Sequence, residues 1–156
     1  MKINDKVFGE LEYNYTWSKD TTIKFLGKEV KIALMVKGNE DGKFEDEQYT
    51  SYNSLVQNWE QVQYDILQPI LDYYKEKRYK LGYDEDEEDE NYSIIKTIEE
   101  LLEKIIFVGI VIPYAGSFEG RDIGLIFDCT WDKENGLGLR LVDEKIVKVG
   151  YQDVAI

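Results

Sequence analysis

The stretch RDIGLIFDCTWDKENGLGLRLVDEKIVKVGYQDVAI, residues 121–156, decides the fold. Apolar residues occupy alternate positions in its first part, which is the pattern of a strand with one face in the core. These residues are Ile123, Leu125, Phe127, Cys129 and Trp131. After a turn-rich segment at residues 132–136, the alternation resumes at Leu137, Leu139 and Leu141. The stretch therefore predicts a three-stranded antiparallel meander.

The turn at residues 132–136 predicts the register of the first two strands. If Trp131 lies opposite Leu137, then Asp128 lies directly across from Arg140. Opposite charges at facing positions attract each other. We therefore expect a structural ion pair between Asp128 and Arg140.

The third strand must also place its apolar side chains on the leucine face. A loop with an odd number of residues, 143–145, achieves this, whereas a two-residue turn would need a bulge to restore the phase. The apolar residues concerned are Val147, Val149 and Tyr151.

The N-terminal third has a similar alternating pattern. Strands are predicted around residues 9–13, 23–25 and 30–36, with a tight turn at Gly27-Lys28. Further along, Phe107–Ile112 is apolar on both faces, which indicates a strand that is covered on both sides. A loop at 114–120 then leads into the meander.

Two helices are predicted between these groups of strands. Apolar residues at helical spacing indicate one long amphipathic helix from Asp46 to Tyr79, and Pro69 predicts a kink or break near Asp65. A shorter helix begins at Thr97, where a capping-box sequence precedes apolar residues. The predicted fold is α+β: a mostly antiparallel sheet of about six or seven strands, with both helices packed on one face.

Length and composition limit the function. The chain has 156 residues, which fits a single domain over 1–156, and a net charge of −13 with no histidine. Lack of histidine removes the commonest general base and most zinc and iron sites, so we expect neither a metal nor a cofactor. The acidic charge disfavours nucleic acid and anionic membranes and favours a basic protein partner.

Localisation is predicted from three further features of the sequence. No apolar run approaches the ~20 residues of a membrane span. The N-terminal residues also lack the order of a secretory signal. A single cysteine, Cys129, agrees with a reducing compartment, so we expect a cytoplasmic protein.

Acidic and aromatic side chains supply the candidate binding surface. Residues 84–90 are seven consecutive acids, which favour a solvated loop over a cation site because like charges repel. Tyrosines flank this run, and tyrosine beside acids suits protein recognition. The candidate protein-binding residues are Trp131, Asp132, Glu134, Tyr83, Asp84 and Tyr92.

Two groups have competing interpretations. Cys129 lies on an apolar strand face with no histidine to activate it, so inert packing is favoured. Asp128, Asp132 and Glu134 form the best carboxylate cluster by spacing. Such a cluster can hold Mg²⁺ or perform acid–base chemistry, although turn preference and pairing with Arg140 explain it structurally.

Several segments resemble a family of small bacterial proteins recorded as a domain of unknown function. They include Phe8–Leu11, Lys96–Leu102, Gly120–Leu125 and Val149–Asp153, and the most specific is Phe127–Gly138, FDCTWDKENGLG. The resemblance implies a bacterial, cytosolic, single-domain α+β protein. It brings no established catalytic residues.

Three functional hypotheses remain open. The first is a non-enzymatic protein-binding protein, of the immunity type, that occludes a basic toxin. The second is a Mg²⁺-dependent hydrolase that uses the carboxylate cluster. The third is a structural or regulatory module that forms homodimers through the mixed face of the C-terminal sheet.

Overall fold

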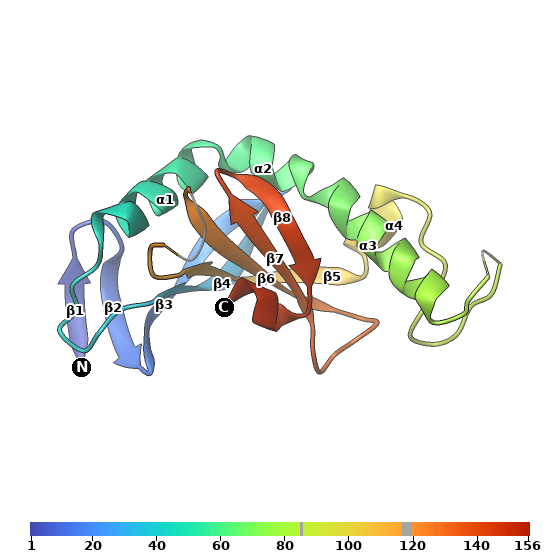
Figure 1. The fold of residues 1–156 in the computed structure, drawn as a ribbon, viewed down its shortest axis with the longest axis horizontal. Coiled ribbons are helices and arrows are strands. Elements are labelled where there is room, and N and C mark those ends of the chain that lie inside the picture. The colour runs from blue at the N-terminus through green and yellow to red at the C-terminus, as the bar shows by residue number, and fades with distance from the viewer. Residues whose placement is uncertain (85, 117–119) are drawn as a thin grey trace.

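A computed structural model describes residues 1–84, 86–116 and 120–156. In this part of the chain, eight strands form one sheet in the order of the sequence (Figure 1). The strands are β1 (Lys2–Asp5), β2 (Gly9–Asn14), β3 (Thr16–Phe25), β4 (Lys28–Val36), β5 (Ile105–Ile112), β6 (Asp122–Cys129), β7 (Leu137–Val142) and β8 (Lys145–Gly150). The helices are α1 (Asp46–Gln57), α2 (Trp59–Asp65), α3 (Leu67–Lys80), α4 (Ile98–Leu102) and the 3₁₀ helix η1 (Gln152–Ala155).

The α+β class and the mostly antiparallel sheet are confirmed. Among the strands of the described residues, only β4 and β5 pair in parallel, because the helical segment between them acts as the crossover connection that parallel strands need. The sheet has one strand more than the six or seven predicted. The additional strand is β1, whose short sequence KIND holds a single apolar residue and so shows no alternation.

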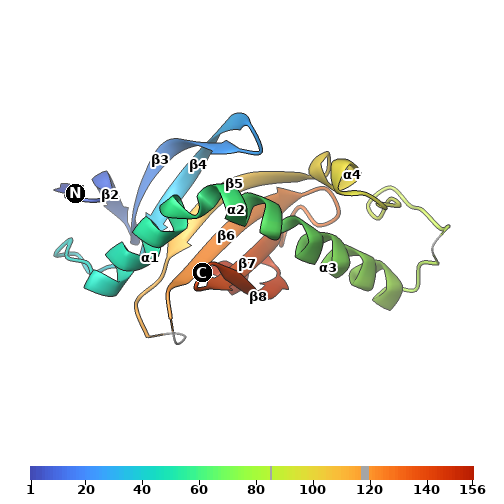
Figure 2. The ribbon, with the colours of Figure 1, turned by 90° about the horizontal axis from the view of Figure 1, so that it is seen from above.

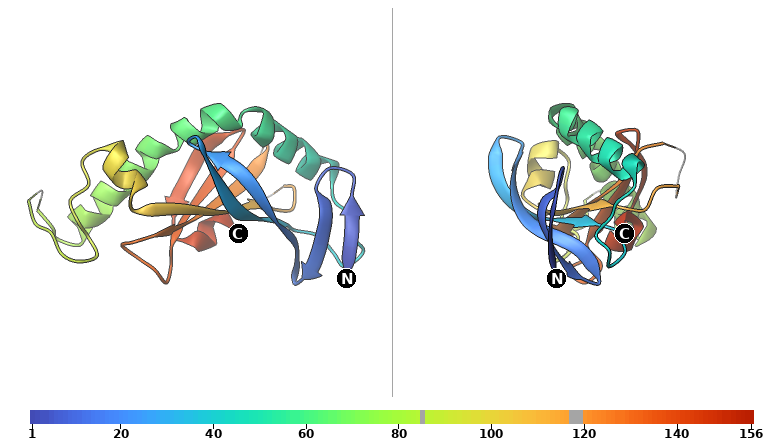
Figure 3. Two further views of the ribbon diagram at one scale, coloured as in Figure 1. Left: turned by 180° about the vertical axis from the view of Figure 1, so that it is seen from behind. Right: turned by 90° about the vertical axis from the view of Figure 1, so that its left-hand side faces the viewer.

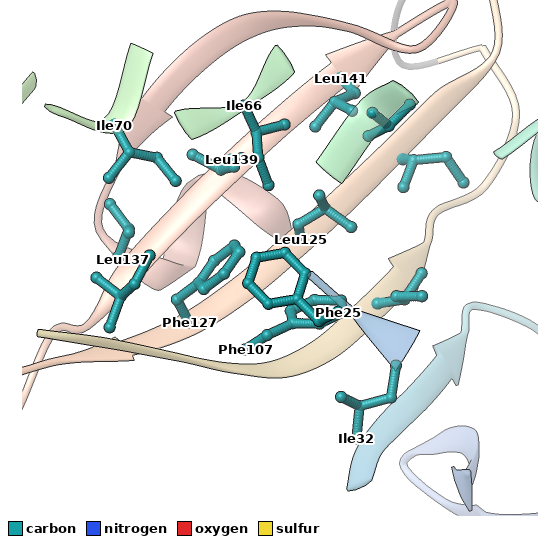
Figure 4. Close-up of a cluster of buried hydrophobic side chains, with 14 of the residues drawn as sticks. Phe25, Ile32, Ile66, Ile70, Phe107, Leu125, Phe127, Leu137, Leu139 and Leu141 are labelled. Carbon is teal, nitrogen blue, oxygen red and sulfur yellow. The ribbon is translucent and has the colours of Figure 1, made fainter. Parts of the chain in front are cut away.

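Helices α1, α2 and α3 pass over one face of the sheet, as predicted (Figure 2). The main core lies between them and the sheet. It includes Phe25, Phe107, Leu125, Phe127 and Leu139, which point toward the helices (Figure 4). The short η1 packs on the opposite face, where Ala155 covers Val111 and Ile126.

The predicted long helix is divided at two points. Helices α2 and α3 form a bent helix of 22 residues, and the bend at Ile66 agrees with the break expected from Pro69. A second break at Asn58 separates α1 from α2. The Asn58 side chain donates to the carbonyl of Ser54 at 2.8 Å, which is a local competitor for helical bonding that the apolar pattern does not reveal.

The start of α4 matches its predicted cap. Thr97 is the N-cap residue, and its hydroxyl oxygen accepts a bond from the backbone N–H of Glu100 at 3.2 Å. The loop predicted at 114–120 includes residues 117–119, which lie outside the described part of the chain.

The register predicted for the meander is wrong by four residues. Leu137 lies opposite Phe127 rather than Trp131, and Leu139 lies opposite Leu125. The reason is that β6 ends at Cys129, and Trp131 turns into the core instead of continuing the strand. A shift of four keeps every side chain on its predicted face, so the leucines still face the helices.

The predicted ion pair between Asp128 and Arg140 is wrong for the same reason. Arg140 lies opposite Gly124, and its Nη1 contacts Oδ1 of Asp122 at 3.1 Å. Asp128 instead accepts a hydrogen bond from Nε2 of Gln152 at 3.2 Å. A buried ion pair exists on this strand pair, but it uses a different aspartate.

The connection between β7 and β8 also differs from the prediction. A two-residue turn, Asp143-Glu144, replaces the three-residue loop, and both residues have positive φ, as type I′ hairpin turns require. A bulge then restores the phase, so that Val149 lies opposite Leu139. Val147, which was predicted to join the leucine face, lies at this bulge and is 53% exposed.

The turn between β3 and β4 lies one residue earlier than expected, at Leu26-Gly27, and it also has positive φ at both positions.

Candidate functional site

Four aromatic rings connect the core to the surface at the C-terminal end of α3. Trp131 lies 4.6 Å from Tyr74, Tyr74 lies 6.3 Å from Tyr92, and Tyr92 lies 5.7 Å from Tyr83, measured between ring centroids. The structure thus brings together three of the candidate residues from separate parts of the sequence. Tyr74 fixes the row by donating from its hydroxyl to the carbonyl of Ser93 at 2.5 Å.

These rings differ in exposure, and this changes the role of Trp131. Trp131 is only 4% exposed and belongs to the main core, so it supports the row and cannot contact a partner directly. Tyr83 and Tyr92 are partly exposed and close the outer end of the row. Asp132 is near enough to Tyr92 for its charge to help raise the pKa of the tyrosine, although burial is the larger cause.

Arg78 organises the acidic run beside these rings. Its guanidinium group is buried and donates to the backbone carbonyls of Asp84, Glu87 and Tyr92. It also lies over the Tyr83 ring, 5.2 Å from the centroid. Residues 84 and 86–90 of the run are therefore a loop, as predicted, whose acidic residues are exposed while its backbone is anchored to a cation.

One residue of the predicted acidic run, residue 85, lies outside the described residues. Among the others, Asp89 accepts bonds from the N–H groups of Asn91 at 2.9 Å and Tyr92 at 2.8 Å, and from the Tyr83 hydroxyl. These bonds lower the pKa of Asp89, with the Tyr83 bond as the largest cause. A hydrogen bond with Asp84 raises the pKa of Glu87, because the two acids are close together.

We call the surface formed by Tyr83, Asp84, Asp89, Tyr92 and Asp132 the acidic tyrosine face. Its aromatic part is rigid because stacked rings and Arg78 hold it. Its three charged members, Asp84, Asp89 and Asp132, are all acidic. Such a surface combines amphipathic rings with charge, and it can bind a protein by contact without any covalent chemistry.

The predicted carboxylate cluster does not assemble. Asp132 accepts bonds from the backbone N–H of Asn135 at 3.1 Å and from its side-chain amide, which hold the turn at residues 132–136, while Asp128 binds Gln152. Glu134 is exposed on the same turn. Among the described residues, no three acidic, cysteine or histidine side chains gather closely enough to hold a metal ion.

Cys129 is buried, and its thiol donates weakly to the carbonyl of Asp132 at 3.5 Å. Burial raises the pKa of this thiol to about 11. A thiol with this pKa is almost entirely protonated near neutral pH, so it is a poor nucleophile. The structure agrees with its interpretation as inert packing.

A hollow beside α3 was not predicted. It has a volume of about 330 Å³ and is lined by Tyr73, Lys77 and Tyr151, among others. The Lys77 ammonium donates to the Tyr151 hydroxyl at 3.2 Å and lies 4.3 Å from the centre of that ring. No sequence pattern indicated this contact, because its two partners lie on α3 and after β8.

A family model described as Domain of unknown function (DUF6985) matches residues 7–156. The chain belongs to this family. Comparisons with curated proteins and with solved structures give no match. In this DUF6985 chain, the role of the FDCTWDKENGLG segment follows from the contacts that it makes.

The contacts of that segment are structural. A Cβ atom at Gly138 would collide with the backbone carbonyl of Tyr151, and one at Gly136, which has φ of 63°, would collide with the side chain of Gln152. Gln152 also donates from its amide to the carbonyl of Phe127 at 2.8 Å. The FDCTWDKENGLG segment of this DUF6985 member thus forms the surface against which η1 packs.

Proposed function

We propose that this DUF6985 member is a non-enzymatic protein of the bacterial cytosol that binds a basic protein partner through the acidic tyrosine face. The observation that carries the proposal is the stacked row ending in Tyr92 and Tyr83, held beside the exposed acids by Arg78. Rigid tyrosines lose little conformational freedom on binding, and the acids steer a basic partner toward them.

The whole-chain charge supports the same class of partner. A net charge of −13 on 156 residues repels nucleic acid and attracts basic surfaces. A basic nuclease-like toxin is such a partner, and a small rigid protein can inhibit it by covering its active surface. We therefore propose an immunity-type function by occlusion.

The other two hypotheses have less geometric support. A Mg²⁺-dependent hydrolase needs converging carboxylates, and Asp128 and Asp132 are engaged by different amide side chains. A homodimer through the mixed face of the C-terminal sheet needs that face free, and η1 already packs against Gly124 and Gly138 there. In the described chain, no helix has the length and apolarity to cross a membrane.

A co-expression experiment tests the proposal. Each toxin candidate encoded beside the gene is expressed in a sensitive host with the wild-type protein, with a Tyr83→Ala/Tyr92→Ala double variant, or with Tyr15→Ala. Tyr15 is 95% exposed and is not part of the acidic tyrosine face, so it is the matched control for loss of a surface tyrosine.

We expect survival with wild type and with Tyr15→Ala, and loss of protection with the double variant. Circular dichroism of the purified variants checks that both fold. The proposal fails if no neighbouring candidate is neutralised, or if the double variant protects as well as wild type.

A further inference from the structure

Strand β3 is paired along only part of one edge. It has ten residues, and all but the first of them pair with β4 on one side. On the other side, β2 pairs only with Thr16, Trp17 and Ser18. The pairing ends at Ser18, and Figure 3 shows that the two strands then diverge. Residues 19–25 therefore form a strand edge without a neighbouring strand among the described residues.

The turn geometry shows which backbone groups this edge presents. Phe25 and Lys28 flank a two-residue turn, so Phe25 exchanges hydrogen bonds with β4, and every second residue before it does the same. The backbone groups of Asp20, Thr22 and Lys24 point the other way. The Lys24 carbonyl accepts a bond from the Trp59 indole at 2.7 Å.

Asp20 and Thr22 have no such partner for their backbone groups within the described chain. Their N–H and C=O groups are thus available at the spacing of a β ladder. The edge is also regular, because the pairing of β3 with β4 contains no bulge. By contrast, the outer strand β8 has a bulge, which is a feature that discourages added strands.

An apolar groove runs beside this edge. It has a volume of about 170 Å³ and lies between β3 and the helices α1 and α2. Thr21 and Ile23 line it from the strand, and Tyr52, Val56 and Trp59 line it from the helices. Cavities of ~150 Å³ can take up benzene, so the groove has room for one large apolar side chain. Val56 is 53% exposed at its mouth.

We propose that this edge and groove bind an extended segment of a partner protein, which adds to β3 as a further strand. The backbone of the segment pairs with Asp20 and Thr22. Its residues opposite Thr21 and Ile23 share the face of those side chains, so they point toward the groove and are apolar. The specific requirement is therefore a strand with a large apolar residue at alternate positions.

This site is separate from the acidic tyrosine face and does not depend on it. The free backbone groups favour a strand as occupant, because the backbone groups inside a helix already pair with one another. The groove has no ring of acids, so an apolar segment, and not a basic one, fits it.

The test uses a phage-displayed library of random short peptides, panned on the full chain. We expect enriched peptides with large apolar residues at alternate positions. A labelled synthetic copy of the most enriched peptide is then titrated by fluorescence anisotropy against wild type, Thr22→Pro, Thr22→Val and Val56→Asp.

Thr22→Pro removes the edge N–H without touching the bonds to β4, and an edge strand tolerates proline. Thr22→Val changes the same side chain and keeps the N–H, so it is the matched control. We expect affinity to fall about tenfold or more for Thr22→Pro, because main-chain bonds are lost, and to stay near wild type for Thr22→Val. Val56→Asp, a surface change that keeps the fold, weakens binding by charging the groove.

Three results would overturn the proposal. The first is an absence of enriched peptides. The second is equal binding of an enriched peptide to Thr22→Pro and to wild type. The third is concentration-dependent self-association of wild type that Thr22→Pro abolishes, because the occupant of the edge would then be a second copy of the chain.

Discussion

Replacement of Arg78 by methionine is expected to release the acidic loop from α3. The change keeps most of the volume of the side-chain stem but removes the guanidinium group of a residue that is only 7% exposed. Three backbone carbonyls, those of Asp84, Glu87 and Tyr92, lose their charged donor. The Tyr83 ring also loses the cation beneath it.

The magnitude follows from these contacts. Hydrogen bonds to charged groups contribute roughly 1.5–3 kcal/mol each, but the freed carbonyls can regain water because the loop lies at the surface. Partial recovery of hydration leaves an expected loss of about 2–3 kcal/mol in the free energy of unfolding. Arg78→Lys is the matched control: it keeps the charge but cannot reach three carbonyls, so it should lie between methionine and wild type.

Urea denaturation followed by tryptophan fluorescence measures the loss, and hydrogen exchange locates it. Amides of residues 86–93 should lose protection in Arg78→Met, while those of β5 and β6 change only by the global destabilisation. A loss below about 0.5 kcal/mol, or unchanged exchange in this loop, would show that Arg78 does not hold the loop.

Three further predictions follow from single residues. Gly138→Ala should lower the free energy of unfolding by about 1–3 kcal/mol in thermal or urea denaturation, because its methyl group would collide with the Tyr151 carbonyl. Cys129, whose thiol pKa is about 11, should react with a thiol reagent at pH 8 only at the rate of unfolding, and fast labelling in native buffer would contradict its burial. Burial acts to raise the pKa of Asp5, but bonds from backbone N–H groups and from the Tyr49 hydroxyl lower this pKa overall. The ionised Asp5 therefore stabilises the fold at pH values above its ordinary pKa of 3.8, and this stabilisation is lost as the pH falls below 3.8. The stability difference between wild type and Asp5→Asn should therefore shrink on acidification, and a pH-independent difference would contradict this cause.

Face assignments could be predicted from the sequence, whereas register could not. The alternation at Leu137, Leu139 and Leu141 correctly placed these residues against the helices. A shift of four residues leaves that alternation unchanged, so the pattern carried no information on where β6 ends. Beyond that end Trp131 turns inward, and its ring packs against Tyr74, which lies 57 positions earlier in the chain.

The sequence predicted most residues of the candidate site, but only part of how they are arranged. Tyr83 and Tyr92 were predicted because they flank the acidic run, and Asp132 because it lies in the turn after Trp131; the structure brings the three together. Arg78 was missed, although a signal existed: it lies four residues after Tyr74 on the apolar stripe, where a cation must find buried acceptors. The free edge of β3 had no signal, because the divergence of β2 is a property of the assembled sheet.

The most direct test of the account is hydrogen exchange on the complex with a toxin that the co-expression experiment identifies. We expect slower exchange on binding at residues 83–93, except residue 85, and at 131–136, with Tyr83→Ala/Tyr92→Ala abolishing the effect. Protection confined to other parts of the chain, such as residues 19–25, would contradict the claim that the acidic tyrosine face is the surface that binds the basic partner.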